Sequence, residues 1–226
     1  MRTLRVLIVA DQESKFIWDY FDRSFFEGVE LIISCGDLKP EYLSFLVTML
    51  PVPLLYVPGN HDGCYDRTPP EGCINLEDCG VYTYKGFRFL GFGGCKSGYS
   101  KRHHYTEHDM QKYVRRSYPT ILRNGGFDVL VTHAAARGLG DGDDAFHQGF
   151  DCFRRLIDAW QPKYHLHGHQ HLSYSYKQKR TEQYGSTSII NGYNYFMMTL
   201  ELPDAPVRRY FPIKPGKGGT DHVLHG

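Results

Sequence analysis

The sequence predicts an α/β protein whose first part forms a parallel β-sheet. Two segments, Leu4–Ala10 and Leu31–Cys35, are almost wholly apolar and rich in β-branched residues, which is typical of strands buried on both faces. Each of them is followed by a segment with apolar residues at helical spacing. Because the resulting order is strand, helix, strand, helix, strand, we expect parallel pairing through right-handed crossovers.

The spacing of apolar residues and the positions of Pro and Gly indicate the helices and the third strand of this first part. Phe16–Phe26 carries aromatic residues at helical spacing and is predicted as a helix. Glu41–Leu50 has an amphipathic pattern that stops at Pro51, so we predict a second helix there. Leu54–Val57 is a third short apolar run, and the Pro-Gly pair that follows it ends a predicted strand.

The rest of the chain is richer in strands. Val81–Tyr84 and Phe87–Phe92 flank a Lys-Gly pair and predict a hairpin. Gly91–His108, which is rich in Gly, Ser, Lys, Arg and His, is predicted as a long surface loop before a helix. The other predicted elements are helices at Asp109–Ser117 and Phe146–Trp160 and strands at Val129–Thr132, Tyr164–His167, Leu172–Tyr176, Thr187–Asn191, Phe196–Leu202 and Val207–Phe211.

Length and composition favour one folded domain. The chain has 226 residues, which is enough to bury a sizeable core, and no linker or internal repeat divides it. Its 41% hydrophobic and 23% charged residues exclude a disordered or collagen-like chain. We therefore expect a single domain over residues 1–213 and a flexible, Gly-rich tail over residues 214–226.

Charge and cysteine usage narrow the functional classes. A formal net charge of +1 argues against a protein that is held to DNA mainly by its total charge. The six cysteines contain no C-x-x-C pair, and the first apolar run is too short for a signal peptide. No apolar stretch approaches the ~20 residues of a membrane-spanning helix. We expect a soluble, cytoplasmic protein with reduced thiols and no membrane partner.

Potential metal ligands follow five of the predicted strands. Each one has an ordinary alternative, since Asp, Asn and Gly are common in turns and helix caps. Turn chemistry alone has no reason to place a ligand after every strand, whereas the carboxyl ends of parallel strands converge at one edge of a sheet. The pattern therefore indicates a divalent-metal site built from Asp11, Gly36-Asp37, Gly59-Asn60-His61-Asp62, His133 and Gly168-His169-Gln170-His171.

This ordered set resembles the calcineurin-like metallophosphoesterase family, and the resemblance runs from about residue 5 to residue 200. Gly-Asn-His-Asp followed much later by Gly-His-x-His is a specific combination. The resemblance implies a four-layer α/β/β/α sandwich with two mixed β-sheets and a dinuclear metal site between them. It also implies a metal-dependent phosphoric ester hydrolase, acting on a small phosphorylated substrate through a hydroxide that bridges the metals.

The resemblance further implies a role for each motif residue. Asp37 would bridge the two metals, Asp11 and His171 would complete the first metal's ligands, and Asn60, His133 and His169 would hold the second. His61 is not a ligand in this pattern. It faces the substrate, where it would stabilise the transition state or protonate the leaving oxygen.

The first two motifs depart from the family pattern. Position 13 is Glu where the family usually has His, and we expect Glu13 to be a metal ligand; the alternative is that it points away and weakens one site. An oxygen-rich site favours manganese or iron, with magnesium or zinc as alternatives. The second motif, Gly36-Asp37-Leu38-Lys39-Pro40, lacks the family's second acid.

Several basic and aromatic residues outside the motifs have two readings. His165 and His167 either support the ligands from behind or pack in the core. The segment Lys101–Tyr105 either closes over an anionic substrate or is a solvated loop. Arg67 and Arg137 are candidates for a phosphate clamp.

The alternative functions are a nuclease acting on DNA or RNA and a non-catalytic metal-binding scaffold for partner proteins. A nuclease needs a continuous basic groove, and the residues that offer one are Lys101, Arg102, Lys112, Arg115 and Arg116. His61 beside the ligands argues against a scaffold, since a purely structural metal site has no use for that residue.

Overall fold

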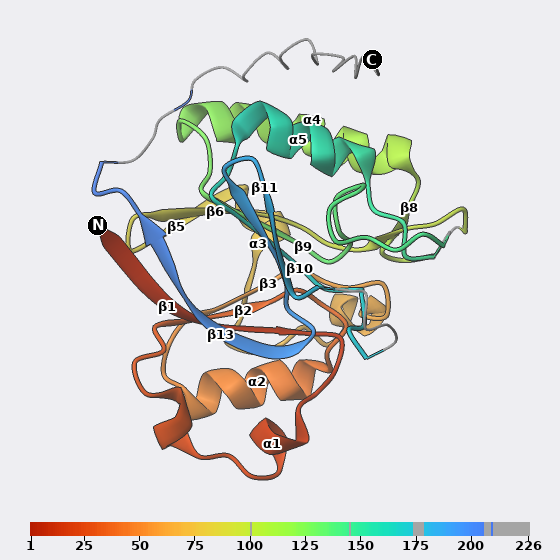
Figure 1. Cartoon of the computed structure of the whole chain (residues 1–226). Coiled ribbons are helices and arrows are strands. Elements are labelled where there is room, and N and C mark those ends of the chain that lie inside the picture. The colour runs from red at the N-terminus through yellow and green to blue at the C-terminus, as the bar shows by residue number, and fades with distance from the viewer. Residues whose placement is uncertain (100, 145, 174–178, 206–208, 210–226) are drawn as a thin grey trace, which may run out of the picture.

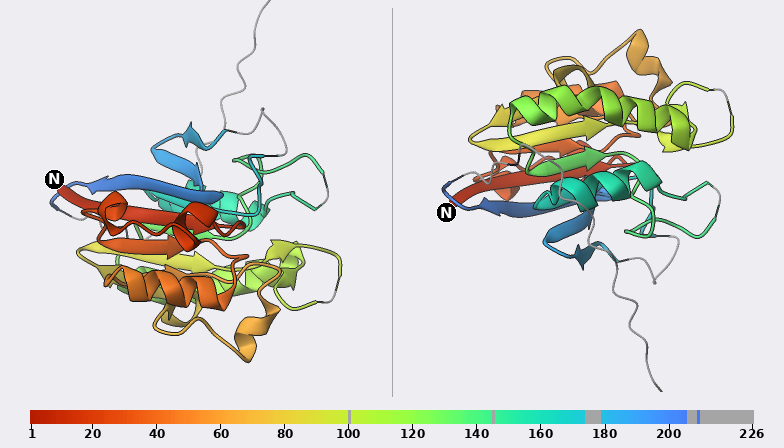
Figure 2. Two further views of the ribbon diagram at one scale, coloured as in Figure 1. Left: turned by 90° about the horizontal axis from the view of Figure 1, so that it is seen from below. Right: turned by 90° about the horizontal axis from the view of Figure 1, so that it is seen from above.

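The computed structural model describes residues 1–99, 101–144, 146–173, 179–205 and 209. The chain forms four layers (Figure 1): helices α1 (Lys15–Trp18) and α2 (Pro40–Met49), a first sheet, a second sheet, and helices α4 (Glu107–Arg123) and α5 (Asp151–Trp160). Seen from above, α4 and α5 lie across the outer face of the second sheet (Figure 2). The predicted α/β/β/α sandwich with two mixed sheets is confirmed.

The first sheet contains the parallel strands that the sequence predicted. Its strand order is β13-β1-β2-β3-β4, and the pairs β1–β2, β2–β3 and β3–β4 are parallel. Strand β13 is antiparallel to β1 over its whole length. The five strands are β1 (Arg2–Ala10), β2 (Leu31–Ser34), β3 (Leu54–Tyr56), β4 (Ile74–Asn75) and β13 (Asn194–Leu202).

The second sheet has the order β11-β12-β10-β9-β6-β5, with parallel pairing in the middle and antiparallel pairing at both edges. A separate parallel pair joins β7 (Cys95–Lys96) to β8 (His104–Tyr105). The strands of the second sheet are β5 (Val81–Tyr84), β6 (Phe87–Phe92), β9 (Val129–Thr132), β10 (Tyr164–His167), β11 (Thr181–Tyr184) and β12 (Thr187–Asn191).

Apolar side chains fill the space between the layers. A central cluster that includes Ile8, Ile33, Val131 and Leu166 lies between the sheets, and all four are fully buried. Two further clusters join α2 to the first sheet and the pair α4–α5 to the second. Strands covered on both faces explain why β1, β2 and β9 read as continuous apolar runs rather than as alternating ones.

The predicted helix over Phe16–Phe26 is wrong. The segment forms the short helix α1 and then a separate 3₁₀ turn, η1 (Arg23–Phe26). Asp22 starts that second turn, because its carboxylate accepts hydrogen bonds from the backbone N–H and the hydroxyl of Ser24. The aromatic spacing serves ring packing between the two turns instead, for example Phe16 against Phe25 with centroids 4.9 Å apart.

Two other helices differ from their predicted bounds. Helix α5 begins at Asp151 rather than Phe146, because Phe150 is drawn into backbone pairing with Ala135 and Ala136. Gly149 permits this approach, since a Cβ there would lie 2.6 Å from the Ala135 carbonyl oxygen. Helix α4 begins at Glu107 rather than Asp109, because Thr106 and Asp109 form a reciprocal capping box at its start, and it continues past Ser117 to Arg123.

Several small elements were not predicted, and some predicted ones lie outside the described residues. The unpredicted elements include α3 (Leu76–Cys79), the 3₁₀ turn η2 (Gly63–Asp66) and the short strands β4, β7, β8 and β11. The strand predicted at Val207–Phe211 and the tail over residues 214–226 fall almost wholly outside the described residues, as does most of Leu172–Tyr176. Within the described part of the chain, no helix combines the length and the apolar character needed to cross a membrane.

Candidate metal centre

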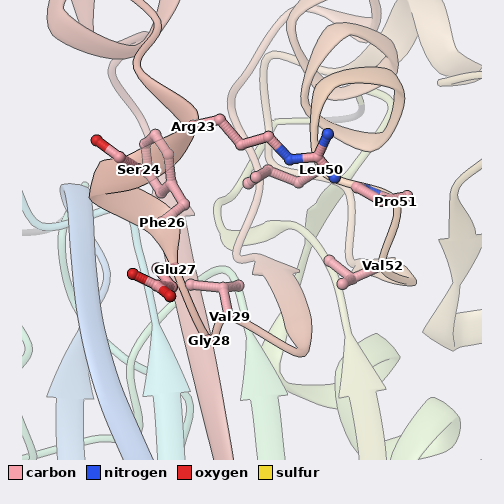
Figure 3. A pocket seen from close by; sticks show the side chains of 9 residues that line it. All are labelled: Arg23, Ser24, Phe26, Glu27, Gly28, Val29, Leu50, Pro51 and Val52. Atoms are coloured by element: carbon pink, nitrogen blue, oxygen red, sulfur yellow. The ribbon is translucent and has the colours of Figure 1, made fainter.

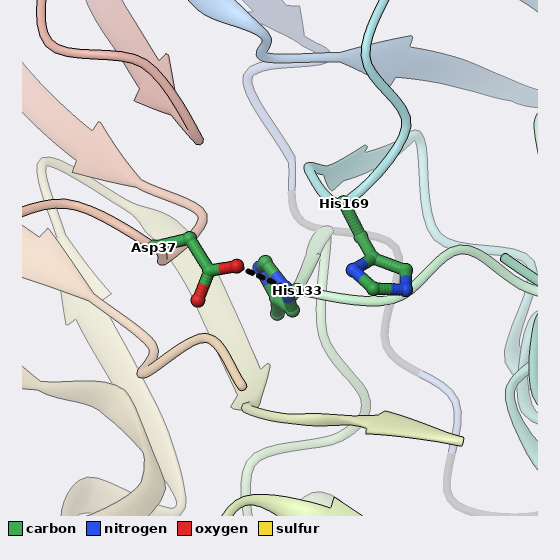
Figure 4. Close-up of side chains that lie close together, drawn as sticks. All are labelled: Asp37, His133 and His169. Atoms are coloured by element: carbon green, nitrogen blue, oxygen red, sulfur yellow. Dashed lines mark ion pairs between the residues drawn. The ribbon is translucent and has the colours of Figure 1, made fainter. Parts of the chain in front are cut away.

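The predicted ligands come from loops at the carboxyl ends of strands in both sheets. Asp11 follows β1 and Asp37 follows β2, while His133 follows β9 and His169 follows β10. Ligand atoms of Asp37, His133 and His169 all lie within 4.8 Å of one another, and Figure 4 shows these three side chains. Residues from both sheets therefore meet at one end of the sandwich.

Left-handed backbone conformations turn these loops toward the centre. Asp11, Asp37 and His169 have φ values of 65°, 58° and 64°. Such angles are uncommon for residues other than glycine, and Asp and His are among those that adopt them most often. Gly36 has φ 94°, and a Cβ there would lie 2.5 Å from the backbone nitrogen of Gly59, so this position requires glycine. Strained loops held by a rigid sheet are common at functional sites.

Asp37 lies at the middle of the cluster. Its Oδ1 accepts a hydrogen bond from the backbone N–H of His61 at 2.7 Å, and its Oδ2 is 3.4 Å from Nε2 of His133. Burial opposes ionisation of this carboxyl, but the neighbouring His133 outweighs it and lowers the pKa of Asp37 below its usual range. Asp37 is therefore a carboxylate at neutral pH, as a metal ligand must be.

Asp62 holds two of the ligand loops together, a role that sequence reasoning missed. Its Oδ2 accepts hydrogen bonds from the backbone N–H groups of Asp37 and Gly59, both at 2.7 Å. Burial, reinforced by the charge of Asp37, raises the pKa of Asp62 to about 6. The available signal was its place as the last residue of the Gly-Asn-His-Asp motif.

His133 is fully buried and is oriented by its neighbours. Its Nδ1 is 2.8 Å from the carbonyl oxygen of Cys35, and its Nε2 is 2.9 Å from Oδ1 of Asn60. Burial disfavours its charged form, but the carboxylates of Asp37 and Asp11 prevail and raise the pKa of His133 to about 9. Without a metal, the imidazole is thus protonated, and a cation on Nε2 would take the place of that proton.

Asp11 provides the test of whether a cation fits. Its Oδ1 accepts a hydrogen bond from the backbone N–H of His169 at 2.8 Å. Its Oδ2 is buried and has no hydrogen-bond partner among the described residues. Burial is the main cause that raises the pKa of Asp11 to about 7. A buried carboxylate oxygen without a partner is costly, and a bound cation is the partner that removes this cost.

His169 is prepared as a neutral ligand. Its Nε2 lies 2.8 Å from the carbonyl oxygen of Phe146, so Nε2–H donates there and Nδ1 is left to accept a metal. Burial, followed by the positive charge on His133, lowers the pKa of His169 to about 3. The Phe146 carbonyl was not found from the sequence, because any residue type can supply it.

Three predicted site residues, Glu13, His61 and His171, are not in the group of Asp37, His133 and His169. Glu13 contacts Lys39, with its carboxylate 3.4 Å from Nζ. The ring of His171 packs against Tyr193 with centroids 5.0 Å apart. His61 is 73% exposed, and its Nε2 lies 4.0 Å from Oδ2 of Asp37. Ligation by Glu13 and His171 stays a prediction, and an exposed pair such as Glu13–Lys39 is weak enough to give way to a cation.

The two histidines that precede the ligands on β10 are buried and neutral. Burial lowers the pKa of both His165 and His167, the latter to about 4. Nε2 of His165 lies 2.8 Å from the hydroxyl of Thr132, and Nδ1 of His167 lies 3.0 Å from the carbonyl oxygen of Gly168. These contacts involve the residues that directly precede His133 and His169, so His165 and His167 help to hold the two ligand loops in place.

The basic residues proposed as phosphate contacts are engaged with acids. Arg102 lies 2.7 Å from the carboxylate of Asp66, and Arg137 lies 3.0 Å from that of Asp141. Both arginines are partly exposed. A phosphate clamp by Arg137 or Arg67 stays a prediction.

A hollow of about 540 Å³ lies at the end of the first sheet that is opposite the candidate metal centre (Figure 3). Its lining comes from residues 23–29 and 50–52, which precede β2 and β3. It therefore lies at the amino ends of these strands, whereas the candidate metal centre lies at their carboxyl ends. In open parallel sheets, ligands bind at the carboxyl ends.

Comparison with known proteins identifies the family. The sequence model of the calcineurin-like phosphoesterases matches residues 4–173, so this chain belongs to the calcineurin-like phosphoesterase family. Members of this family are generally dinuclear metal hydrolases, and some are non-catalytic. No curated protein matches the chain significantly in sequence.

Two solved structures support the fold. One crystal structure is 17% identical with a TM-score of 0.63, and the match covers 88% of this chain and 95% of that chain. The protein TT1561 of Thermus thermophilus is 16% identical with a TM-score of 0.56, and the match covers 85% of this chain and 90% of that one. At these identities the likeness shows the fold alone.

Proposed function

We propose that this chain is a metal-dependent hydrolase of a small phosphomonoester or phosphodiester. The observation that carries the proposal is the convergence of Asp37, His133 and His169 within 4.8 Å, beside the unpartnered oxygen of Asp11. Carboxylate oxygens and imidazole nitrogens from separate loops are the donors that divalent ions take in proteins. Family membership supports the same reaction class.

The donor set suits two divalent ions of intermediate hardness. Mixed oxygen and imidazole donors favour manganese or iron over magnesium. When bound, such ions supply a nucleophilic water near neutral pH and neutralise the charge of the phosphate. The residues that would hold them are Asp11, Asp37, Asn60, His133 and His169, with Glu13 and His171 as further predicted ligands.

His61 is the proposed catalytic residue of the chain itself. Its backbone is fixed by the hydrogen bond to Asp37, while its ring is exposed at the open side of the centre. A histidinium there donates a hydrogen bond to the charge that develops on the phosphate, and then gives its proton to the leaving oxygen.

Exchange of Asp37 tests the proposed function most directly. We expect Asp37→Asn to reduce turnover of nitrophenyl phosphate and bis-nitrophenyl phosphate to the background level, because the central anionic ligand is lost. Turnover is measured with manganese, iron, magnesium and zinc in parallel, together with metal content. Asp204→Asn, which changes an exposed carboxylate at the far end of β13, is the matched control. Unchanged turnover in Asp37→Asn, or metal-loaded wild-type protein without activity, would contradict the proposal.

Exchange of His61 separates catalysis from metal binding. We expect His61→Gln to keep its metal while turnover falls by about 10²–10⁴-fold, the usual contribution of a general acid. Metal analysis and rate are measured on the same preparation. His108→Gln, at an exposed position of α4, serves as the control. Loss of metal in His61→Gln would show that His61 is a ligand instead.

A further inference from the structure

A cavity of about 400 Å³ lies between α3, the end of β6 and α4. Helix α4 lines it with Tyr113, Arg116, Ser117 and Thr120. Their spacing places them on one face of the helix. This face is polar, although α4 packs on the second sheet through Met110, Val114 and Ile121. The volume is within the range of about 300–1,000 Å³ that is typical of small-molecule sites.

A buried histidine in the wall of this cavity lacks partners. His103 is only 4% exposed, and neither of its ring nitrogens has a hydrogen-bond partner in the described part of the chain. Its backbone is held in a left-handed conformation with φ 57°, and its carbonyl oxygen accepts the N–H of Cys95. Burial lowers the pKa of His103, so the ring is neutral and offers one donor and one acceptor. The ring therefore contributes a neutral, uncharged surface to the cavity wall.

Two carboxylates, Glu77 and Asp78, also line the cavity. Glu77 uses Oε1 to accept the backbone N–H of Gly93, and Asp78 uses Oδ2 to accept the side-chain amide of Asn75. Each carboxylate thus has a second oxygen for another donor. The rings of Tyr105 and Tyr113 lie 5.3 Å apart and form an edge-to-face pair beside them.

Two guanidinium groups complete the lining. Arg116 lies over the ring of Tyr113, with its Cζ 5.8 Å from the centroid. Arg102, which also lines the cavity, pairs with Asp66. Arginine is the side chain best suited to bind phosphate groups through parallel hydrogen bonds.

We propose that this cavity binds a nucleoside monophosphate. The tyrosine rings offer surfaces for a heteroaromatic base, and the second carboxylate oxygens of Glu77 and Asp78 match the N–H donors on the edge of such a base. The arginines match its phosphate. The cavity shares no residue with the proposed metal ligands, so the inference does not rest on the proposed hydrolysis. It adjoins the centre through Phe92, whose carbonyl oxygen accepts the backbone N–H of His133 at 3.2 Å.

Calorimetric titration of the full chain with AMP, GMP, CMP and UMP tests the proposal. Each titration is repeated on Asp37→Asn, so that turnover at the metal centre cannot be mistaken for binding. Ribose 5-phosphate and inorganic phosphate are the probes without a base. We expect saturable binding of at least one nucleotide and at least tenfold weaker binding of ribose 5-phosphate.

Two variants locate the binding site. Thr120→Trp fills the cavity and Arg116→Ala removes the phosphate contact, and we expect each to weaken nucleotide binding at least tenfold. Arg115→Ala removes the same charge one position along α4, outside the cavity, and should bind as the wild type does. Circular dichroism verifies the fold of each variant. Absence of saturable binding by all four nucleotides, equal binding of ribose 5-phosphate, or full affinity in Arg116→Ala would overturn the proposal.

Discussion

Two buried charge clusters lie at opposite ends of this molecule, and only one of them is satisfied by the chain itself. At the amino ends of β6 and β9, the guanidinium of Arg88 contacts both carboxylate oxygens of Asp128, at 2.9 and 2.7 Å. The same guanidinium donates to the carbonyl oxygens of Asn124 and Gly125. The backbone N–H of Arg88 also donates to Asp128. Charge and hydrogen bonds are both matched there.

At the carboxyl ends, the balance is different. Asp11 and Asp37 face the protonated imidazole of His133, and one oxygen of Asp11 has no partner among the residues described. The chain thus supplies more buried acceptors than donors at this end. Burial of charge alone therefore does not indicate a binding site. At this end the unmatched oxygen of Asp11 lies among the carboxylate and imidazole groups of the metal-ligand cluster, and this combination is what suits a ligand from outside the chain.

The largest change in the free energy of unfolding is expected for the ion pair of Arg88 and Asp128. Asp128→Asn leaves the Arg88 guanidinium buried without its counter-charge, so we expect the free energy of unfolding to fall by about 3–5 kcal/mol. Denaturant titration measures this change. Metal content per folded chain should be unaltered, because the pair lies at the opposite end of the sheet. A stable Asp128→Asn protein that binds less metal would break the distinction between the two clusters.

At the cluster of metal ligands we expect a smaller change in the free energy of unfolding, and one of opposite sign. Asp11→Asn removes a buried charge, and a pKa raised from 3.8 to about 7 corresponds to roughly 4 kcal/mol. The new amide N–H left without a partner costs about 1–3 kcal/mol. At pH 8, we therefore expect the chelator-treated variant to be more stable than the wild type by about 1–3 kcal/mol. Its affinity for metal should fall.

The pH dependence sharpens this test. Because the pKa of Asp11 is higher in the folded than in the unfolded chain, ionisation of this carboxyl destabilises the fold as pH rises from about 4 to about 7. The Asp11→Asn variant does not lose stability in this way, because it has no carboxyl at position 11 to ionise. Its advantage over the wild type should thus be absent near pH 4 and complete above pH 7, as measured by denaturant titration at each pH. An advantage independent of pH would show that the charge of Asp11 is not its cause.

Much of the fold was predictable because its strands are covered on both faces. Continuous apolar runs marked β1, β2 and β9, and the hairpin of β5 and β6 was predicted with its observed bounds. The helices were harder to predict, since Asp22 and Gly149 act through local hydrogen bonds and close backbone approach. Apolar periodicity carries no information on either.

The candidate site was predictable as a set rather than residue by residue. Asp11, Asp37, His133 and His169 each follow a strand, and parallel topology brings such positions to one end of the sandwich. The residues that orient them left weaker signals. Asp62 acts through backbone N–H groups, and His169 is oriented by the main chain of Phe146, so neither contact depends on a recognisable pairing of side chains.

The antiparallel pairing of β13 with β1 has a consequence for synthesis on the ribosome. All strands of the first sheet except β13 have emerged by Asn75, whereas β13 ends at Leu202. Synthesis proceeds at about 5–20 residues per second, so the row of backbone N–H and C=O groups on β1 that later pairs with β13 stays unpaired for roughly 6–25 s. An open apolar edge of this kind is prone to pair with other chains. The nascent protein is therefore most vulnerable to aggregation after its first third is made, and a chaperone that shields β1 would help it most in that interval.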